Sequence, residues 1–263
     1  MTWQTIILDT DPRGVATLTL NRTDKHNAMS AQMIAELTEA ATQIAGDDTI
    51  RAVILTGAGA SFCAGGDLAW MQAQMQADSA TRAVEAGRLA GMLGAMNSLP
   101  KPLIGRVQGP AYGGGMGLIS VCDVAVGVTG AKFGFTETRL GLIPATIGPY
   151  VLARMGETMA RRVFMSARLF DAHEAQTMGL LARVVEAEAL DAAVEAEVTP
   201  YLSCAPGAVA SAKALALRLG GGIAGDAVEH SIAQLVARWE SAEAAEGIDA
   251  FFGKRKPAWV RRT

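Results

Sequence analysis

The stretch "GPAYGGGMGLISVCDVAVGVTGAKFGFTETRLGLIPA" runs from Gly109 to Ala145 and contains the features that decide the fold. It opens with a glycine-rich turn, which leads into an apolar segment of helical character. The run "CDVAVGV" then has the length and composition of a buried strand. One glutamate, Glu137, follows in the segment "FGFTETRLG". A turn, a helix, a strand and a lone carboxylate together indicate an α/β unit that carries a candidate site.

The segments before this stretch continue the alternation of strands and helices. "TIILDT" and "VATLTLN" read as strands, with "DPRG" as the turn between them. Ser30 can cap the next helix, whose apolar residues recur at helical spacing. Strands are predicted over 5–10, 15–21, 51–57, 100–109 and 122–128, and helices over 31–47 and 69–99.

The character of the chain changes near its C-terminal end. The alternation continues to about residue 190, and from Ala205 onward the patterns are helical without a strand. We therefore expect an α/β core over residues 1–200 and a helical C-terminal region over 201–263.

Composition excludes several classes of protein. Half of the 263 residues are hydrophobic, 19% are charged and the formal net charge is −3, which indicates a globular protein without a nucleic-acid surface. No signal peptide is recognisable and Asp123 interrupts the most apolar region, so we expect no membrane span and a cytoplasmic location. The three histidines form no metal-ligand pattern, and no metal is expected.

The three cysteines, Cys63, Cys122 and Cys204, are scattered without a CxxC pair, which is typical of a reducing compartment. Cys63 in "FCAGG" is a conceivable nucleophile, but no base stands beside it in the sequence. We favour its interpretation as a small buried hydrophobic residue.

Two glycine loops, "FCAGGDL" and "AYGGGMGL", are candidate anion sites. Glycine lets backbone N–H groups approach a ligand closely, and two such groups can form an oxyanion hole. A dinucleotide site is disfavoured because Phe62 stands where the fingerprint that begins at Gly57 needs a small residue. Tight turns and helix packing explain the same glycines equally well, so the loops alone leave both interpretations open.

The order in which several motifs occur along the chain favours the interpretation of these loops as an anion site. The chain resembles the crotonase superfamily, also called the enoyl-CoA hydratase/isomerase family, over essentially its whole length. The resemblance implies the crotonase (ClpP-like) fold, a spiral of ββα units with a helical C-terminal trimerisation region. It rests on the segments "HNAM", "SFCAGGDL", "PKPLIGRVQGPAYGGGMGL", "CDVAV", "KFGFTETRLGLIP" and "ARLFDAHEAQTMGL".

The resemblance also implies roles for particular residues. The N–H groups of Gly66 and Gly114 would hold the thioester oxygen of an acyl-CoA, and Glu137 would be the catalytic acid/base. Hydratases of the family usually carry a second glutamate, at the position that is Gly117 here. We therefore expect an enoyl-CoA hydratase first, a Δ3–Δ2-enoyl-CoA isomerase that uses Glu137 alone second, and a non-catalytic acyl-CoA-binding protein third.

Three further polar residues could face the same pocket: Tyr112, Thr146 and Tyr150. For the two tyrosines we favour core packing. For Thr146 we favour a hydrogen bond within its own loop.

Finer similarities point to methylglutaconyl-CoA hydratases and the related isohexenylglutaconyl-CoA hydratases, and hence to a branched substrate with a distal carboxylate. The pathway is left open between leucine, terpenoid and fatty-acid breakdown, and Arg139 is given no role. CoA belongs to the substrate, so no separate cofactor is expected. The resemblance implies a homotrimer or a dimer of trimers, and CoA contacts at Lys25, Ala28, Ala64, Gly66, Asp67, Leu68, Phe251 and Lys254.

Overall fold

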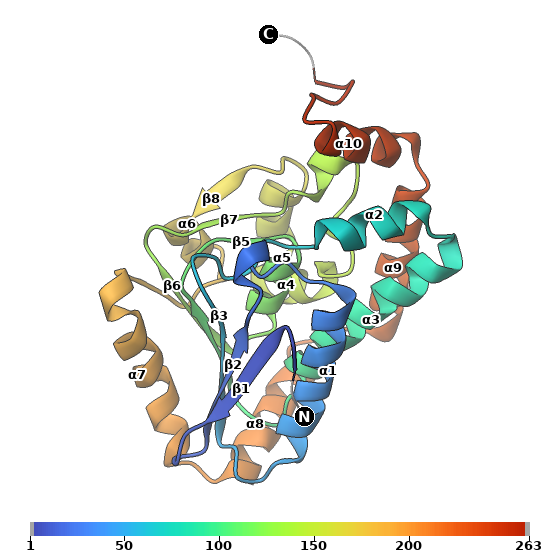
Figure 1. Cartoon of the computed structure of the whole chain (residues 1–263). Coiled ribbons are helices and arrows are strands. Elements are labelled where there is room, and N and C mark those ends of the chain that lie inside the picture. The colour runs from blue at the N-terminus through green and yellow to red at the C-terminus, as the bar shows by residue number, and fades with distance from the viewer. Residues whose placement is uncertain (1–2, 261–263) are drawn as a thin grey trace.

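The computed structural model describes residues 3–260, whose strands form two sheets (Figure 1). The larger sheet has six strands in the order β1-β2-β3-β4-β6-β9, and the smaller has three in the order β5-β7-β8. The strands are β1 Ile6–Thr10, β2 Val15–Leu20, β3 Ala52–Gly57, β4 Leu103–Val107, β5 Ala111–Tyr112, β6 Val124–Val128, β7 Lys132–Gly134, β8 Leu169–Asp171 and β9 Arg183–Val185.

The larger sheet is parallel except at its first hairpin. β1 and β2 pair antiparallel through the predicted "DPRG" turn, in which Asp11 Oδ1 accepts hydrogen bonds from the N–H groups of Arg13 and Val15. The pairs from β2 to β9 are parallel. Helices cover both faces of such a sheet, which explains why β3 reads as the continuous apolar run "AVILTG".

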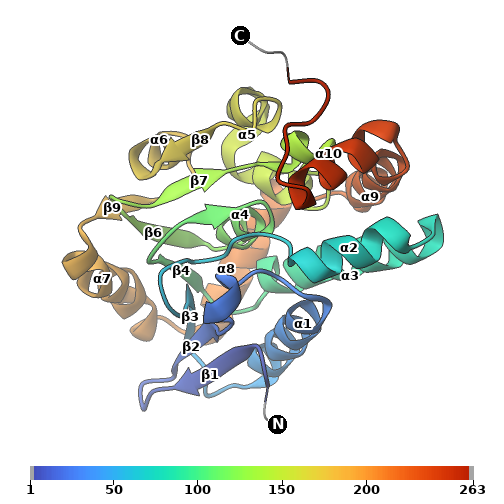
Figure 2. The ribbon, with the colours of Figure 1, turned by 45° about the horizontal axis from the view of Figure 1, so that its top comes forward.

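Helices flank this sheet on two sides (Figures 1 and 2). α1 and α3 pack together on one side, and α7 packs against β3, β4 and β6 on the other. The helices are α1 Ala31–Gly46, α2 Leu68–Gln76, α3 Ser79–Asn97, α4 Gly114–Ser120, α5 Gly148–Phe164, α6 Ala172–Thr177, α7 Leu190–Leu202, α8 Pro206–Leu219, α9 Gly225–Trp239 and α10 Ala242–Phe252. Short 3-10 helices are η1 Thr23–Lys25, η2 Glu137–Leu140 and η3 Ala187–Ala189.

The single helix predicted over residues 69–99 is wrong, because α2 and α3 are separate. The chain leaves the helical conformation at Ala77, and the Asp78 carboxylate accepts a hydrogen bond from Thr81 N–H. This side-chain cap satisfies a first-turn donor and starts a new helix. By contrast, the predicted cap Ser30 is confirmed, since its hydroxyl accepts from Met33 N–H at 3.2 Å.

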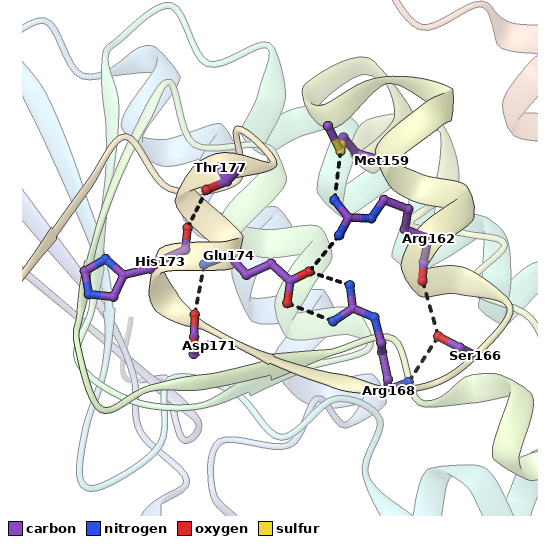
Figure 3. A network of polar contacts seen from close by, with 8 residues as sticks. All are labelled: Met159, Arg162, Ser166, Arg168, Asp171, His173, Glu174 and Thr177. Atoms are coloured by element: carbon purple, nitrogen blue, oxygen red, sulfur yellow. Dashed lines mark hydrogen bonds and ion pairs between the residues drawn. The ribbon is translucent and has the colours of Figure 1, made fainter.

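A charged network fixes the edge strand β8 to the helices beside it (Figure 3). The Glu174 carboxylate on α6 accepts from both terminal nitrogens of Arg168, and it also pairs with Arg162 of α5. The Arg168 guanidinium in turn lies 6.0 Å from the ring centroid of Phe170. These contacts fix Arg168 and Phe170, the two residues that flank Leu169 in the chain.

The last two helices, α9 and α10, lie next to each other (Figure 2). α9 packs against α3, and α10 packs against η2. Arg238 of α9 donates two hydrogen bonds to the Gly141 carbonyl, which directly follows η2. The predicted division at residue 200 falls in the last turns of α7, and it stays a prediction. None of the helices within residues 3–260 has the length and apolar character that crossing a bilayer requires.

Candidate active site

A cavity of about 520 Å³ lies where the two glycine loops, η2 and the C-terminal helices meet. Gly66, Gly114 and Glu137 all line it, so the three residues predicted to be catalytic are brought together. Much of the remaining wall is apolar and comes from distant parts of the chain. It includes Trp70, Met71, Leu142, Leu235, Trp239 and Phe251.

The first glycine loop presents the N–H group of Gly66. Met29 pairs with this loop through Met29 N–H to Gly65 O at 2.7 Å and Asp67 N–H to Met29 O at 2.9 Å. Within residues 3–260, the N–H of Gly66 has no hydrogen-bond acceptor. Gly65 has a φ of +93°, a conformation that favours glycine and lets the loop turn at this point.

The second glycine loop presents the N–H group of Gly114, the first residue of α4. The N–H groups of a helix's first turn have no partner inside the helix, and no other acceptor for Gly114 N–H lies in the described part of the chain. Gly113 has a φ of +48°, and a Cβ there would lie 3.2 Å from Glu137 Oε1. The second loop therefore lies directly against the carboxylate.

Glu137 opens η2 and places a largely buried carboxylate beside the two loops. Its Oε2 atom is enclosed and has no hydrogen-bond partner among residues 3–260. Burial raises the pKa of Glu137 from 4.5 to about 7, against a smaller opposing effect of its own backbone N–H. A group with this pKa can both accept and release a proton near neutral pH.

The raised pKa of Glu137 predicts a pH-dependent stability. The folded protein binds the proton of Glu137 more tightly than the unfolded chain does. Protonated Glu137 therefore adds its full contribution to the free energy of unfolding below pH 4.5, and this contribution is lost as pH rises through about 7. The shift corresponds to about 3 kcal/mol in the free energy of unfolding. Urea unfolding at pH 4.5 and pH 8 should show this loss in the wild type and not in Glu137→Gln. Equal losses in both proteins would contradict it.

The position of the missing second glutamate is closed by apolar side chains. A Cβ on Gly117 would lie 2.6 Å from Ile147 Cγ2 and 3.4 Å from Leu93 Cδ1. The first distance is shorter than any normal carbon contact, so a larger residue at position 117 requires Ile147 to move. A hydrophobic side chain thus fills the place where the family pattern has a carboxylate.

The three further polar residues differ in their surroundings. Tyr150 is buried and donates to the Ala90 carbonyl at 2.9 Å, which confirms the prediction of core packing for this residue. Tyr112 is partly exposed and lines the cavity, so the prediction of core packing is wrong for this residue. The predicted loop hydrogen bond of Thr146 is wrong, because its buried Oγ1 has no partner within residues 3–260. Thr146 also lines the cavity.

The residues predicted to contact CoA divide into two groups. Ala64, Gly66, Leu68 and Phe251 line the cavity. The others do not line it: Lys25 and Lys254 are exposed, Ala28 is buried, and Asp67 caps α2 and forms an ion pair with Arg22 at 2.9 Å.

Cys63 lies in the same loop but is chemically unsuited to be a nucleophile. Its side chain is completely buried, and burial raises the pKa of its thiol to about 12. The thiol therefore stays protonated at neutral pH. No cluster of three or more His, Cys, Asp or Glu residues that could hold a metal ion occurs between residues 3 and 260.

Known proteins are similar to this chain over its whole length or nearly so. Residues 10–262 match the family model described as "Enoyl-CoA hydratase/isomerase". The "Probable enoyl-CoA hydratase echA8" of Mycobacterium tuberculosis is 33% identical, covering 100% of both chains. The "Crotonyl-CoA hydratase" of Syntrophomonas wolfei is 31% identical, again covering 100% of both.

Solved structures agree with this assignment. The crystal structure of an enoyl-CoA hydratase from Shewanella pealeana superposes with a TM-score of 0.80 at 35% identity, covering 98% of this chain and 96% of that one. The arrangement of sheets and helices is therefore the crotonase fold that the resemblance implied. The chain belongs to the enoyl-CoA hydratase/isomerase family.

Proposed function

We propose that the protein is an enoyl-CoA hydratase that adds water across the α,β double bond of an acyl-CoA thioester. One observation carries this proposal. Gly66 and Gly114, whose N–H groups have no acceptor within residues 3–260, line one cavity together with Glu137, whose Oε2 is buried. Such donors stabilise an oxygen that gains negative charge, and the carboxyl group transfers the proton.

The proposed reaction needs only one titrating group. Protonated Glu137 gives its proton to Cα while water oxygen bonds to Cβ and the double bond is lost. The added water releases one proton to the carboxylate, which restores the acid. The two N–H groups hold the thioester oxygen, whose negative charge rises in the enolate-like transition state.

Purified protein should be mixed separately with 3-methylglutaconyl-CoA, crotonyl-CoA and a 3-enoyl-CoA. The ultraviolet absorbance of the conjugated thioester should fall, and the product should gain the mass of water. Conjugation that appears from the 3-enoyl-CoA without a change in mass, and no hydration of the other two, would replace the hydratase by an isomerase.

The direction of the pH profile separates these two reactions. A hydratase that uses Glu137 as acid needs it protonated, so kcat/KM for hydration should fall tenfold per pH unit above about pH 7. An isomerase that uses Glu137 first as base needs it ionised, so kcat/KM should instead rise up to about pH 7. Measuring initial rates from pH 5 to 9 gives the sign, and a rising limb would contradict the proposed role as acid.

The isomerase remains the second candidate because of the wall around Gly117. Ile147 leaves that side of the cavity apolar, whereas hydratases of the family usually have a second glutamate there. Moving a proton from one carbon to another requires one acid/base and no water. A non-catalytic acyl-CoA-binding protein has less support, because such a protein gains nothing from a buried Glu137 Oε2 that has no partner between residues 3 and 260.

For the acyl group we propose a branched chain of the methylglutaconyl type. The cavity suits a branched apolar chain, since most of its lining is aliphatic or aromatic. Within residues 3–260, Arg139 is its one cationic lining residue, and the Arg139 guanidinium has no ion-pair partner there. A distal carboxylate would therefore bind at Arg139, and 3-methylglutaconyl-CoA should have a lower KM than crotonyl-CoA.

We further propose a homotrimer or a dimer of trimers. In its support, α8 (Pro206–Leu219) has no buried residue. Leu215 and Leu219, which are 58% and 77% exposed, lie four residues apart on one face of this helix, where a neighbouring subunit would cover them. The cytoplasmic location and the absence of a separate cofactor stay predictions. So do all of the CoA contacts, which are those of Lys25, Ala28, Ala64, Gly66, Asp67, Leu68, Phe251 and Lys254.

A further inference from the structure

Two buried side-chain polar atoms lack a hydrogen-bond partner within residues 3–260, and they belong to the same cavity. One is Glu137 Oε2 and the other is Thr146 Oγ1. Both residues line the cavity that Gly66 and Gly114 also line, and the N–H groups of these glycines have no acceptor in the described part of the chain. Because buried polar atoms are nearly always paired, two exceptions at one site indicate a ligand that pairs them.

The hydroxyl of Thr146 has no evident part in holding the fold. Thr146 precedes α5, whose N-cap is Ile147, and that helix starts without a side-chain cap. Thr56 is also buried, and its hydroxyl donates to the Arg106 carbonyl at 2.9 Å. Leaving a hydroxyl unpaired in the interior costs about 1–3 kcal/mol, so Thr146 is unfavourable for the fold alone.

The reaction proposed above lacks a second group to bind the water. A water molecule in a closed site typically makes two to four hydrogen bonds. Ile147 and Leu93 close the position at Gly117, so this position supplies no carboxylate to the cavity. Thr146 directly precedes Ile147. The same loop that closes one polar position therefore places a residue with a buried, unpaired hydroxyl in the cavity wall.

We propose that Thr146 is the second polar residue of the hydration reaction. Its hydroxyl binds the water that adds to Cβ and holds it while Glu137 transfers protons. Thr146 does not titrate; the water's departing proton goes to the Glu137 carboxylate. This inference rests on the proposed hydratase activity and assigns it a water site that differs from the two-glutamate arrangement.

Three variants test the role of the hydroxyl. Thr146→Val keeps the shape and removes the hydroxyl, and Thr146→Ser keeps the hydroxyl. Thr56→Val removes a buried hydroxyl that is already paired and that belongs to a residue outside the cavity lining. Hydration of 3-methylglutaconyl-CoA and crotonyl-CoA gives kcat and KM, calorimetry gives the Kd of butyryl-CoA, and thermal unfolding gives Tm.

Thr146→Val should lower kcat by about tenfold to a hundredfold, the loss expected for one hydrogen bond in the transition state. Its KM, its Kd for butyryl-CoA and its Tm should stay close to the wild-type values, or Tm should rise. Thr146→Ser should retain most of the activity. Thr56→Val should show the opposite pattern, with a lower Tm and an unchanged kcat.

Two results would overturn the inference while leaving the hydratase intact. These are a Thr146→Val variant that hydrates at the wild-type kcat, and a Thr146→Ser variant that is as slow as Thr146→Val. If the proposed function itself is wrong, the wild type forms no hydrated product. This outcome differs from the two results above, and it would also refute the proposed water site.

Discussion

A Glu137→Gln variant is expected to fold as the wild type does and to lose about a hundredfold to ten-thousandfold in kcat. Glutamine has nearly the same shape but can neither release nor accept the proton in the reaction. The carboxyl group is buried, and its Oε2 has no partner to lose within residues 3–260. The substitution therefore removes the chemistry with little disturbance of packing, and stability at pH 8 should rise.

The matched control for this variant is Glu36→Gln. Glu36 is also buried, but its carboxylate accepts hydrogen bonds from the N–H groups of Gln4 and Thr5, and from the Thr5 hydroxyl. Its glutamine variant should lower Tm and leave kcat unchanged. Steady-state kinetics and thermal unfolding of both variants test the contrast. Full turnover by Glu137→Gln would refute its role as acid/base.

The second large effect is expected at Gly66. Proline at this position removes the N–H group that faces the cavity, because proline has no amide hydrogen. Loss of one oxyanion-hole donor typically lowers kcat by about a hundredfold to a thousandfold. We expect a loss of this size in Gly66→Pro, measured with the preferred enoyl-CoA.

Gly66→Ala is the control for the added atoms. A Cβ at Gly66 would lie 3.7 Å from Met71 Cγ and 3.8 Å from the Trp70 ring, which are ordinary contacts. The alanine variant keeps the N–H and should retain activity within a few-fold. Circular dichroism must show that Gly66→Pro is folded. If the folded proline variant turned over as fast as the alanine variant, the oxyanion role of Gly66 would be wrong.

The parts of the fold that the sequence predicted are those that local chemistry determines. The "DPRG" turn and the Ser30 cap each depend on side chains that bond to backbone within four residues. The break at Asp78 was missed because small and polar residues that tolerate a helix continue across it. The usable signal was an aspartate three residues before Thr81, which is a typical capping position.

The two loops of the site were recognisable from motifs, whereas the surroundings of Gly117 were not. Position 117 is closed by Ile147 and Leu93, which lie 30 and 24 residues away in the chain. No local pattern indicates such a contact, since it depends on how α5 and α3 pack around α4. The unpaired hydroxyl of Thr146 was missed for the same reason, because pairing depends on every neighbour in space.

The hydrogen bonds from α9 to the end of η2 couple two properties of the enzyme, namely the shape of its cavity and the position of the Glu137 carboxyl group. Leu235 and Trp239 of α9 shape the acyl cavity, and Arg238 between them holds the Gly141 carbonyl four residues after Glu137. A change that shifts α9 to admit a longer chain therefore also displaces the carboxyl group that performs the chemistry. Engineering for larger substrates should begin at side chains such as Leu235, with the backbone of α9 left in place.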